Sequence, residues 1–308
     1  MRPSSLLFVL PLFFTACGGE TATTGGGGAP GPTPLAKPAV GMQIASGKIT
    51  VAPGKEQYSC WSFKVPDSGA ISLVGIENQI PAAGIHHYAV FTNSEPVKEA
   101  GPYSCETMGI SWGLISGGGL GTPGVKFPEG TAMSLKAGQH VIFQLHLINT
   151  TSDAIDIDPA YINLVGTTAK DQIPVGLLIA GTLDISIPAH GKDLGFSGGC
   201  AVKDPMEHIF SVFPHMHKLG KRISAEITPS AGGAPQVIAD QIWDFKDQGL
   251  YAVKGSAAVG DTVKVTCRYD NPTEKDVNFG LTTADEMCVN VLYYYPAKSP
   301  ASYCGIGN

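Results

Sequence analysis

Short apolar runs of strand length recur along the chain, and turn-forming residues separate them. Gly, Pro, Asp and Asn lie between the runs, and none of the runs keeps a helical period. Runs of this length between turn residues are typical of the strands of a sandwich or barrel. The pattern therefore predicts an all-β chain, with strands at residues 70–76, 87–92, 140–149, 160–165, 207–213, 222–228, 262–269 and 288–295.

The run at residues 140–148 also predicts which side chains face the core. One alternating set is wholly apolar: Val141, Phe143, Leu145 and Leu147. Successive side chains of a strand point to opposite faces. We therefore expect this set in the core, and Gln144 and His146 on the other face, where they are available to a cleft.

The length of 308 residues suits about two domains once a targeting segment is removed. A strand-like run gives way to a polar stretch at residues 168–173, so we predict domains at residues 39–170 and 171–308. The net charge of −6 gives no basic surface, and we expect no nucleic-acid partner.

The first 17 residues look like the signal peptide of a bacterial lipoprotein. Arg2 precedes an apolar run at residues 6–14, which is too short to span a membrane. Thr15 and Ala16 are small and stand directly before Cys17, as in a lipobox, so Cys17 is the expected lipidation site. The alternative is an ordinary signal peptide with a chance cysteine.

Residues 18–38 are rich in Gly and Pro and cannot bury a core, which predicts a flexible linker. The chain is therefore expected to be exported and attached to a bacterial membrane, either the outer membrane or the cell surface, through the lipid anchor only.

Six cysteines remain beyond Cys17, at positions 60, 105, 200, 267, 288 and 304. An even number in an exported chain predicts three disulfides, and the sequence alone leaves their pairing open. Metal binding by thiolates is the disfavoured alternative, because no CxxC spacing occurs.

Five of the eight histidines fall into three short motifs: His86-His87, Gln144-Leu-His146 and His215-Met-His217. Two residues separated by one on a strand share a face, so the HxH pair suits one metal ion. Adjacent histidines of a regular strand point to opposite faces, and can bind one ion only where the backbone bends. Pro81 and Gly84 favour such a bend. The three motifs together predict a metal site but do not identify the metal.

A soft ligand would identify it. Met287 opens a strand after a turn, but composition alone does not distinguish it among seven methionines, because Met is normally a core residue. A thioether together with imidazoles favours copper, especially Cu(I), over zinc.

The sequence resembles the copper type II, ascorbate-dependent monooxygenases, a family that includes peptidylglycine alpha-hydroxylating and dopamine beta-monooxygenases. The resemblance runs from about residue 58 to residue 304, and it implies two tandem antiparallel β-sandwich domains of jelly-roll-like form. It rests on these motifs in this order: Tyr58-Ser-Cys60, His86-His87, Gln144-Leu-His146, His215-Met-His217-Lys-Leu-Gly-Lys221, and Asp285-Glu-Met287-Cys288 followed by Tyr293-Tyr294.

The resemblance implies two copper ions per chain. The electron-transfer copper would be held by three imidazoles: His86, His87 and His146. The catalytic copper, which binds oxygen, would be held by His215, His217 and Met287. Ascorbate or another electron donor would reduce both ions, and dioxygen would supply the oxygen atom inserted into a C–H bond of a small organic substrate.

The resemblance also implies the disulfide pairs Cys60–Cys105, Cys200–Cys304 and Cys267–Cys288. Gln144 lies two residues from His146, and we assign it the role of orienting that site without binding the metal itself.

Three positions depart from the peptide-hydroxylating members of the family. Where those members hold a substrate carboxylate with arginine, this chain has Phe213. Their tyrosine four residues after the methionine is Val291 here, and an expected asparagine is Val289. The charge and hydroxyl that would bind a peptide C-terminus are missing, so we expect no action on glycine-extended peptides and a more apolar pocket.

Two other functions remain open. A non-enzymatic copper-binding or storage lipoprotein would use the same ligands, although storage needs no division between an all-imidazole site and a thioether site. A zinc hydrolase is disfavoured, because Met is a poor zinc ligand and no general-base glutamate stands beside the HxH motif. The leading prediction is a monomeric monooxygenase of an unknown small substrate.

Overall fold

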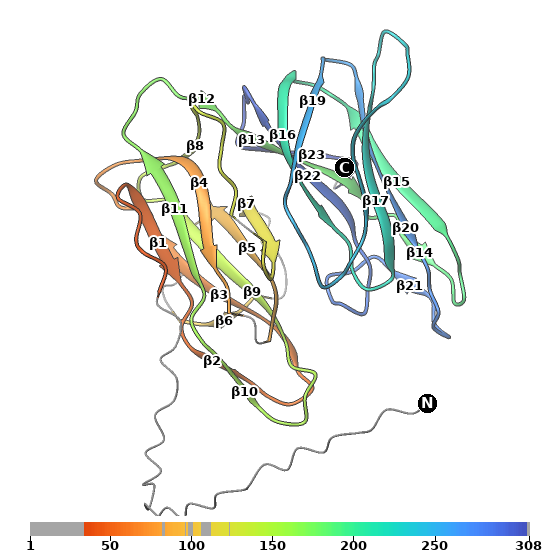
Figure 1. Cartoon of the computed structure of the whole chain (residues 1–308), viewed down its shortest axis with the longest axis horizontal. Helices are drawn as coiled ribbons and strands as arrows, with labels where there is room; N and C mark the ends of the chain where they lie inside the picture. The colour runs from red at the N-terminus through yellow and green to blue at the C-terminus, as the bar shows by residue number, and fades with distance from the viewer. Residues whose placement is uncertain are drawn as a thin grey trace, which may run out of the picture. The chain divides into compact units, whose positions relative to one another are not determined.

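The regular structure of this protein consists of β-strands. The computed structural model describes residues 34–81, 84–95, 97, 101–105, 112–122 and 124–306. In these residues every helix or strand element is a strand, which confirms the all-β prediction (Figure 1). Over the same residues, none of the structure forms an apolar helix of membrane-spanning length. The signal peptide at 1–17, the lipidation site Cys17 and residues 18–33 of the linker lie outside the described residues.

Twelve strands precede residue 175 in the described part of the chain. Their bounds are β1 Gly41–Ala45, β2 Ile49–Val51, β3 Glu56–Lys64, β4 Ile71–Gln79, β5 Ile85–Asn93, β6 Tyr103–Ser104, β7 Trp112–Gly119, β8 Thr131–Leu135, β9 His140–Ile148, β10 Ile155–Ile157, β11 Tyr161–Thr167 and β12 Ile173–Pro174. They form two five-stranded sheets, in the orders β1-β11-β4-β8-β12 and β6-β3-β9-β5-β7, and the pair β10-β2. Only the short β12–β8 pairing among them is parallel.

Eleven strands follow between residues 175 and 306. Their bounds are β13 Gly176–Thr182, β14 Ser186–Ile187, β15 Leu194–Ala201, β16 Met206–His215, β17 Gly220–Thr228, β18 Gln236–Ile242, β19 Tyr251–Ala257, β20 Thr262–Tyr269, β21 Val277–Asn278, β22 Cys288–Tyr295 and β23 Ala301–Cys304. They form a five-stranded sheet β19-β16-β22-β13-β23, a four-stranded sheet β15-β20-β17-β18 and the pair β14-β21. The β13–β23 pairing is parallel and the others are antiparallel.

Each group of strands is a sandwich around a buried apolar cluster. The first cluster takes side chains from both large sheets of its group, for example Leu164 of β11 and Trp61 of β3. It also contains the alternating set predicted for the core: Val141, Phe143, Leu145 and Leu147. The second cluster joins the sheets that contain β22 and β20, for example through Leu292 and Val265. Burial of one face of each sheet is what the alternating apolar pattern stabilises.

Strand β22 is buried on both faces and connects the two clusters. Val291 and Tyr293 belong to the first cluster, whereas Cys288, Leu292 and Tyr294 belong to the second. The Tyr293 hydroxyl also donates a hydrogen bond to the backbone oxygen of Ile115 in β7 at 3.2 Å. The sheet that contains β22 therefore lies between the two cores, and residues 34–308 form one compact unit.

The predicted division into residues 39–170 and 171–308 stays a prediction. Strand β12 pairs with β8 of the first group, so the change from one group to the other comes at residue 175. At the other end, the backbone oxygens of Leu35 and Ala36 accept hydrogen bonds from the side chains of Gln43 and Asn163 at 2.6 and 2.7 Å. The last residues of the predicted linker therefore lie along β1 and β11.

Three disulfides connect the strands. They are Cys60–Cys105, Cys200–Cys304 and Cys267–Cys288, which are the pairs that the family resemblance implied. The second of them closes the longest loop, with a sequence separation of 104 residues. Each closed loop restricts the unfolded chain, an effect of about 2–4 kcal/mol per bridge on the free energy of unfolding.

Candidate metal centre

A β-bulge brings the adjacent histidines to one side of strand β5. His87 stands directly opposite His146 in the β5–β9 ladder, and the register shifts between Ile85 and His87, so His86 is the extra residue of the bulge. Gly84, immediately before this strand, has a φ of 70°, a conformation that suits glycine. The bend that two neighbouring ligands require is therefore present.

The three imidazoles of this first ligand group lie close together. One ligand atom from each of His86, His87 and His146 falls within 4.8 Å of the others. The Nδ1 atoms of His87 and His146 are 3.5 Å apart. A single ion that accepts a nitrogen from each ring fits this spacing, because metal–imidazole distances are about 2 Å.

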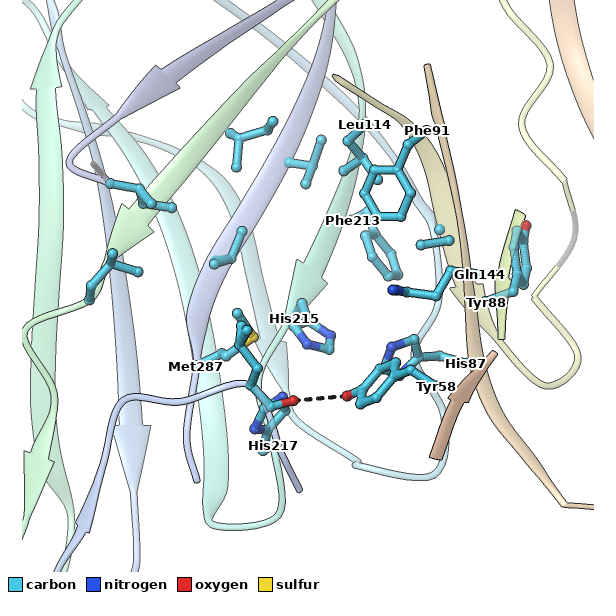
Figure 2. Close-up of a pocket in the computed structure, with 18 of the residues that line it drawn as sticks. Tyr58, His87, Tyr88, Phe91, Leu114, Gln144, Phe213, His215, His217 and Met287 are labelled. Carbon is cyan, nitrogen blue, oxygen red and sulfur yellow. Dashed lines mark hydrogen bonds between the residues drawn. The ribbon is translucent and has the colours of Figure 1, made fainter. Parts of the chain in front are cut away.

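Aromatic rings enclose the first group. The ring of Tyr58 stacks on that of His146, with centroids 4.1 Å apart and planes 9° from parallel. The Tyr58 hydroxyl donates to the backbone oxygen of Leu281 at 2.8 Å, the dashed line in Figure 2. Phe245 lies against His86 with a centroid distance of 3.9 Å. His146 is fully buried as a result.

The second ligand group lies at the end of β16. His215 is the last residue of that strand, and the intervening Met216 is fully buried in the second core, so His215 and His217 point away from it. The two imidazole centroids are 5.2 Å apart. Figure 2 shows the sulfur of Met287 on the same side of the cavity as the two imidazole rings.

Hydrogen bonds leave the same ring nitrogen free on both imidazoles of the second group. His217 Nδ1 donates to the backbone oxygen of Asp285 at 3.0 Å, and His215 Nδ1 donates to Gln248 Oε1 at 2.9 Å. Each Nε2 therefore keeps its lone pair, and the partner on Nδ1 fixes the orientation of the ring.

Glu286 connects the two segments that carry the second group. This fully buried carboxylate accepts hydrogen bonds from the backbone N–H groups of His217 and Leu219 at 3.0 and 2.6 Å. Burial raises the pKa of Glu286 to about 7, although its backbone hydrogen bonds act in the opposite direction. It ties the turn after β16 to the residue that precedes Met287.

Two side chains join the first group to the second. Gln248 is fully buried, its Oε1 accepts from His215, and its Nε2 donates to His86 Nε2 at 3.0 Å. The bond to His86 uses the lone pair of the neutral ring, so His86 would give it up on binding a metal. Glu56 accepts from His146 Nε2 at 2.8 Å and from the Thr283 hydroxyl at 2.6 Å. The imidazole centroids of His87 and His215 are accordingly only 5.3 Å apart.

All five imidazoles are neutral near pH 7. Burial lowers the pKa of His86 and His215 to about 3 and that of His146 to about 4. Burial also lowers the pKa values of His87 and His217, and neighbouring imidazoles add to the effect on His87. The pKa of Glu56 is lowered overall, since its hydrogen bonds from Thr283 and His146 outweigh the raising effect of burial. Neutral imidazole is the form that binds a metal.

This donor set fits copper. Three neutral imidazoles serve both Cu(I) and Cu(II), and a thioether added to two imidazoles favours Cu(I). The hydrogen bonds that fix His146, His215 and His217 leave on each ring one nitrogen free for an ion.

An apolar cavity of about 280 Å³ opens beside the second group. Its wall includes His87, His215, His217 and Met287, together with apolar side chains from β5, β7, β13, β16 and β22 (Figure 2). Gln144 also lines it, but the Gln144 amide nitrogen donates to the backbone oxygen of Cys105 at 3.1 Å rather than to an imidazole. Its orienting role at His146 stays a prediction.

The sequence did not point to Glu56, Gln248 or Glu286. Glu56 and Gln248 stand in no ligand motif, and Glu286 lies in the motif of Met287 without an assigned role there; each acts through a partner far away in the chain. The bond from Gln248 to His86 spans 162 residues, and that from Glu56 to Thr283 spans 227. An acidic residue directly before Met287 was the only visible signal, and it has no meaning until the chain is folded.

The sequence of this chain is similar to a copper monooxygenase family model and to several monooxygenases. Residues 174–306 match the family model described as copper type II ascorbate-dependent monooxygenase, C-terminal domain. DBH-like monooxygenase protein 1 of Homo sapiens is 24% identical over 277 residues, covering 78% of this chain and 44% of its own length. Dopamine beta-hydroxylase of Canis lupus familiaris is 21% identical, and the match covers 83% of this chain and 45% of that protein. Tyramine beta-hydroxylase of Caenorhabditis briggsae is 23% identical, and the match covers 70% of this chain and 40% of that protein.

Residues 174–306 are therefore similar to the C-terminal domain of the copper type II ascorbate-dependent monooxygenase family, and the relatives extend the similarity over most of the chain. The chain spans less than half the length of these curated relatives.

Proposed function

We propose that this chain is a copper-dependent monooxygenase of a small organic substrate. One oxygen atom of dioxygen enters a C–H bond of the substrate and the other leaves as water, while ascorbate or another reductant supplies the electron pair. Two copper ions per chain are proposed, one at His86, His87 and His146, and one at His215, His217 and Met287. The observation that carries the proposal is the pairing of an all-imidazole group with a thioether group beside one apolar cavity.

Copper at these two groups would supply the electrons and activate the dioxygen. The protein's own part is to hold and orient. Glu56 and the Asp285 carbonyl keep the rings of His146 and His217 fixed, with one nitrogen free on each. The apolar wall beside Met287 excludes water and holds a C–H bond near the second group.

A non-enzymatic copper store is the second candidate, and the cavity argues against it. A store needs ligands but no room for an organic molecule beside them. Here about 280 Å³ of apolar space adjoins the thioether group, which is the size range in which small-molecule sites begin. We also propose that the chain is exported, because three disulfides favour an oxidising compartment, that Cys17 carries the lipid anchor, and that the chain is a monomer.

The test is metal content combined with oxygen consumption. We expect the purified chain to bind two copper ions and, with ascorbate, to consume oxygen in step with hydroxylated product from a panel of small aromatic and aliphatic compounds. The matched control is Met287→Ala, which should lose turnover and keep copper at the first group. Copper binding without turnover would favour the store, and zinc without a redox response would favour a hydrolase.

A further inference from the structure

The cavity beside Met287 carries information about the substrate that the metal ligands do not. Its apolar wall has two parts. Buried residues form the inner part, including Phe91, Ile179, Phe213 and Val291. Partly or fully exposed residues form the outer part, including Leu183, Phe279, Leu281 and Tyr303, and Tyr303 is 51% exposed. A ligand would therefore enter past the outer residues and lie against the inner ones.

The lining offers no group that pairs with a charged substrate. Among the described residues that line the cavity there is no Asp, Glu, Lys or Arg. The carboxylates that bond to the ligand groups or directly precede Met287 are occupied: Glu56 accepts from His146 and Thr283, Asp285 Oδ2 accepts from Thr282, and Glu286 accepts from backbone N–H groups. An ammonium or carboxylate would lose its water in this cavity and gain no partner.

Two tyrosine hydroxyls of the wall are already used as well, and the third tyrosine, Tyr303, stands in the exposed outer part. Tyr58 donates to the backbone oxygen of Leu281, and the Tyr88 hydroxyl accepts from the Asn78 amide at 3.0 Å. The surface that remains for a ligand is therefore dominated by carbon. Burial of apolar surface is the main attraction that such a wall provides.

The size of the cavity bounds the ligand. A closed apolar cavity of roughly 150 Å³ binds benzene. At about 280 Å³, this cavity has room for one ring with a short side chain. Gly117 helps to set the width, because a Cβ at that position would lie 3.1 Å from Cε1 of Phe213.

We propose that this cavity selects a neutral apolar substrate about the size of a monosubstituted benzene, and rejects molecules of the same shape that carry an ammonium or a carboxylate group. The inference rests on the proposed function, since it names the substrate class of the same site. The proposed function predicts copper-dependent turnover, whereas this inference predicts selective binding of a ligand, which can be measured without copper and without turnover.

The experiment is calorimetric binding to the full chain, with and without copper, of three probes of similar shape: n-propylbenzene, 2-phenylethylammonium and 3-phenylpropionate. We expect the neutral probe to bind at least tenfold more tightly than either ion. Equal or tighter binding of an ion, or no binding of the neutral probe up to its solubility, would overturn the proposal.

A charge placed on the wall should reverse the preference. Val289 lines the cavity and is only partly buried, so Val289→Asp introduces a carboxylate with access to water. We expect this variant to bind 2-phenylethylammonium more tightly than n-propylbenzene. The control is Val259→Asp, the same change at a side chain that is 59% exposed and does not line the cavity. An unchanged preference in a folded Val289→Asp variant would contradict the assignment of this cavity as the binding site.

The outcomes separate the two proposals. If the cavity binds the neutral probe selectively but the chain shows no reductant-driven oxygen consumption, the proposed monooxygenase function is contradicted and the proposed selectivity of the cavity is supported. If the chain efficiently hydroxylates an ammonium or carboxylate substrate, the proposed selectivity is contradicted and the proposed monooxygenase function is supported.

Discussion

The two ligand groups differ in what surrounds them. His86, His87 and His146 are enclosed by the rings of Tyr58 and Phe245. All three ligands of the second group line the apolar cavity, whereas His87 alone represents the first group among the described residues of its wall. Under the proposed function, the first group would exchange electrons and the second would meet the substrate.

The groups also differ in how they are supported. In the first group, His146 depends on one side chain, the carboxylate of Glu56. In the second group, His217 depends on a backbone carbonyl, that of Asp285, and the buried Glu286 holds its backbone. A backbone partner moves only if the loop that carries it moves, here the loop between β21 and β22, so the second group should tolerate fewer changes in its supporting loop than the first.

The largest effect should come from deleting one ligand of each group. We expect His146→Ala and His217→Ala each to reduce the copper content from two ions to one, and to reduce turnover to background. The reason is that each variant leaves the other group's ligands and hydrogen bonds in place. Elemental analysis and electron paramagnetic resonance would check this. Loss of both ions in either variant would mean that the two groups form one site.

Changing only the softness of the second group should have the next largest effect. Met287→His replaces a thioether with a third imidazole, so the second group would come to resemble the first. We expect the copper content to stay the same and the rate of hydroxylation to fall by at least about 100-fold, because the thioether steadies Cu(I). X-ray absorption should report the loss of the sulfur ligand. Full turnover in this variant would remove Met287 from the catalytic site.

These contrasts also mark what could be predicted from the sequence. The HxH motif implies its own geometry, because alternation puts His215 and His217 on one side and Met216 in the core. The His86-His87 pair can share one side of a strand only where the backbone bends. Gly84 predicted that bend, and the structure has it as a register shift between Ile85 and His87. Gln248 and Glu56 could not be predicted, because their partners are fixed by the packing of segments 90 or more residues away, or 33 in the case of His215.

Gln248 forms a hydrogen bond with one ligand of each group. Removing its amide should affect copper binding less than deleting a ligand does. Its carbonyl oxygen holds the Nδ1 proton of His215, while its amide donates to Nε2 of His86. We expect Gln248→Leu to weaken copper binding at the second group by about 10- to 100-fold, the usual effect of losing a partner that orients a ligand. Copper titration with a competing chelator would measure it.

The loop around Gln248 should survive this change. Its backbone oxygen accepts hydrogen bonds from the Thr122 hydroxyl at 2.7 Å and from the Gly119 N–H at 2.9 Å, and neither involves the side chain. The matched control is Gln172→Leu, at a partly exposed glutamine whose amide donates to the backbone oxygen of Lys170 and to no ligand group among the described residues. Equal copper affinity in the two variants would show that the Gln248 amide has no orienting role.

The smallest expected effect is that of Glu56→Gln, and it separates charge from hydrogen bonding. Glutamine keeps an oxygen for His146 Nε2 and for the Thr283 N–H, and the Thr283 hydroxyl can accept from the new amide where it now donates. The hydrogen bonds can therefore persist, weakened by the loss of the charge, and we expect copper affinity at the first group to fall only a few-fold.

The reduction potential should respond more clearly than the affinity. A carboxylate beside His146 stabilises Cu(II) relative to Cu(I), so its neutralisation should raise the potential of the first copper more than that of the second, because Glu56 bonds directly to His146 and acts on His217 only through space. Potentiometry followed by electron paramagnetic resonance would separate the two ions. An equal rise in the reduction potential of both ions would mean that the charge of Glu56 acts equally on the two groups. The groups would then differ in their surroundings but not in their electrostatics.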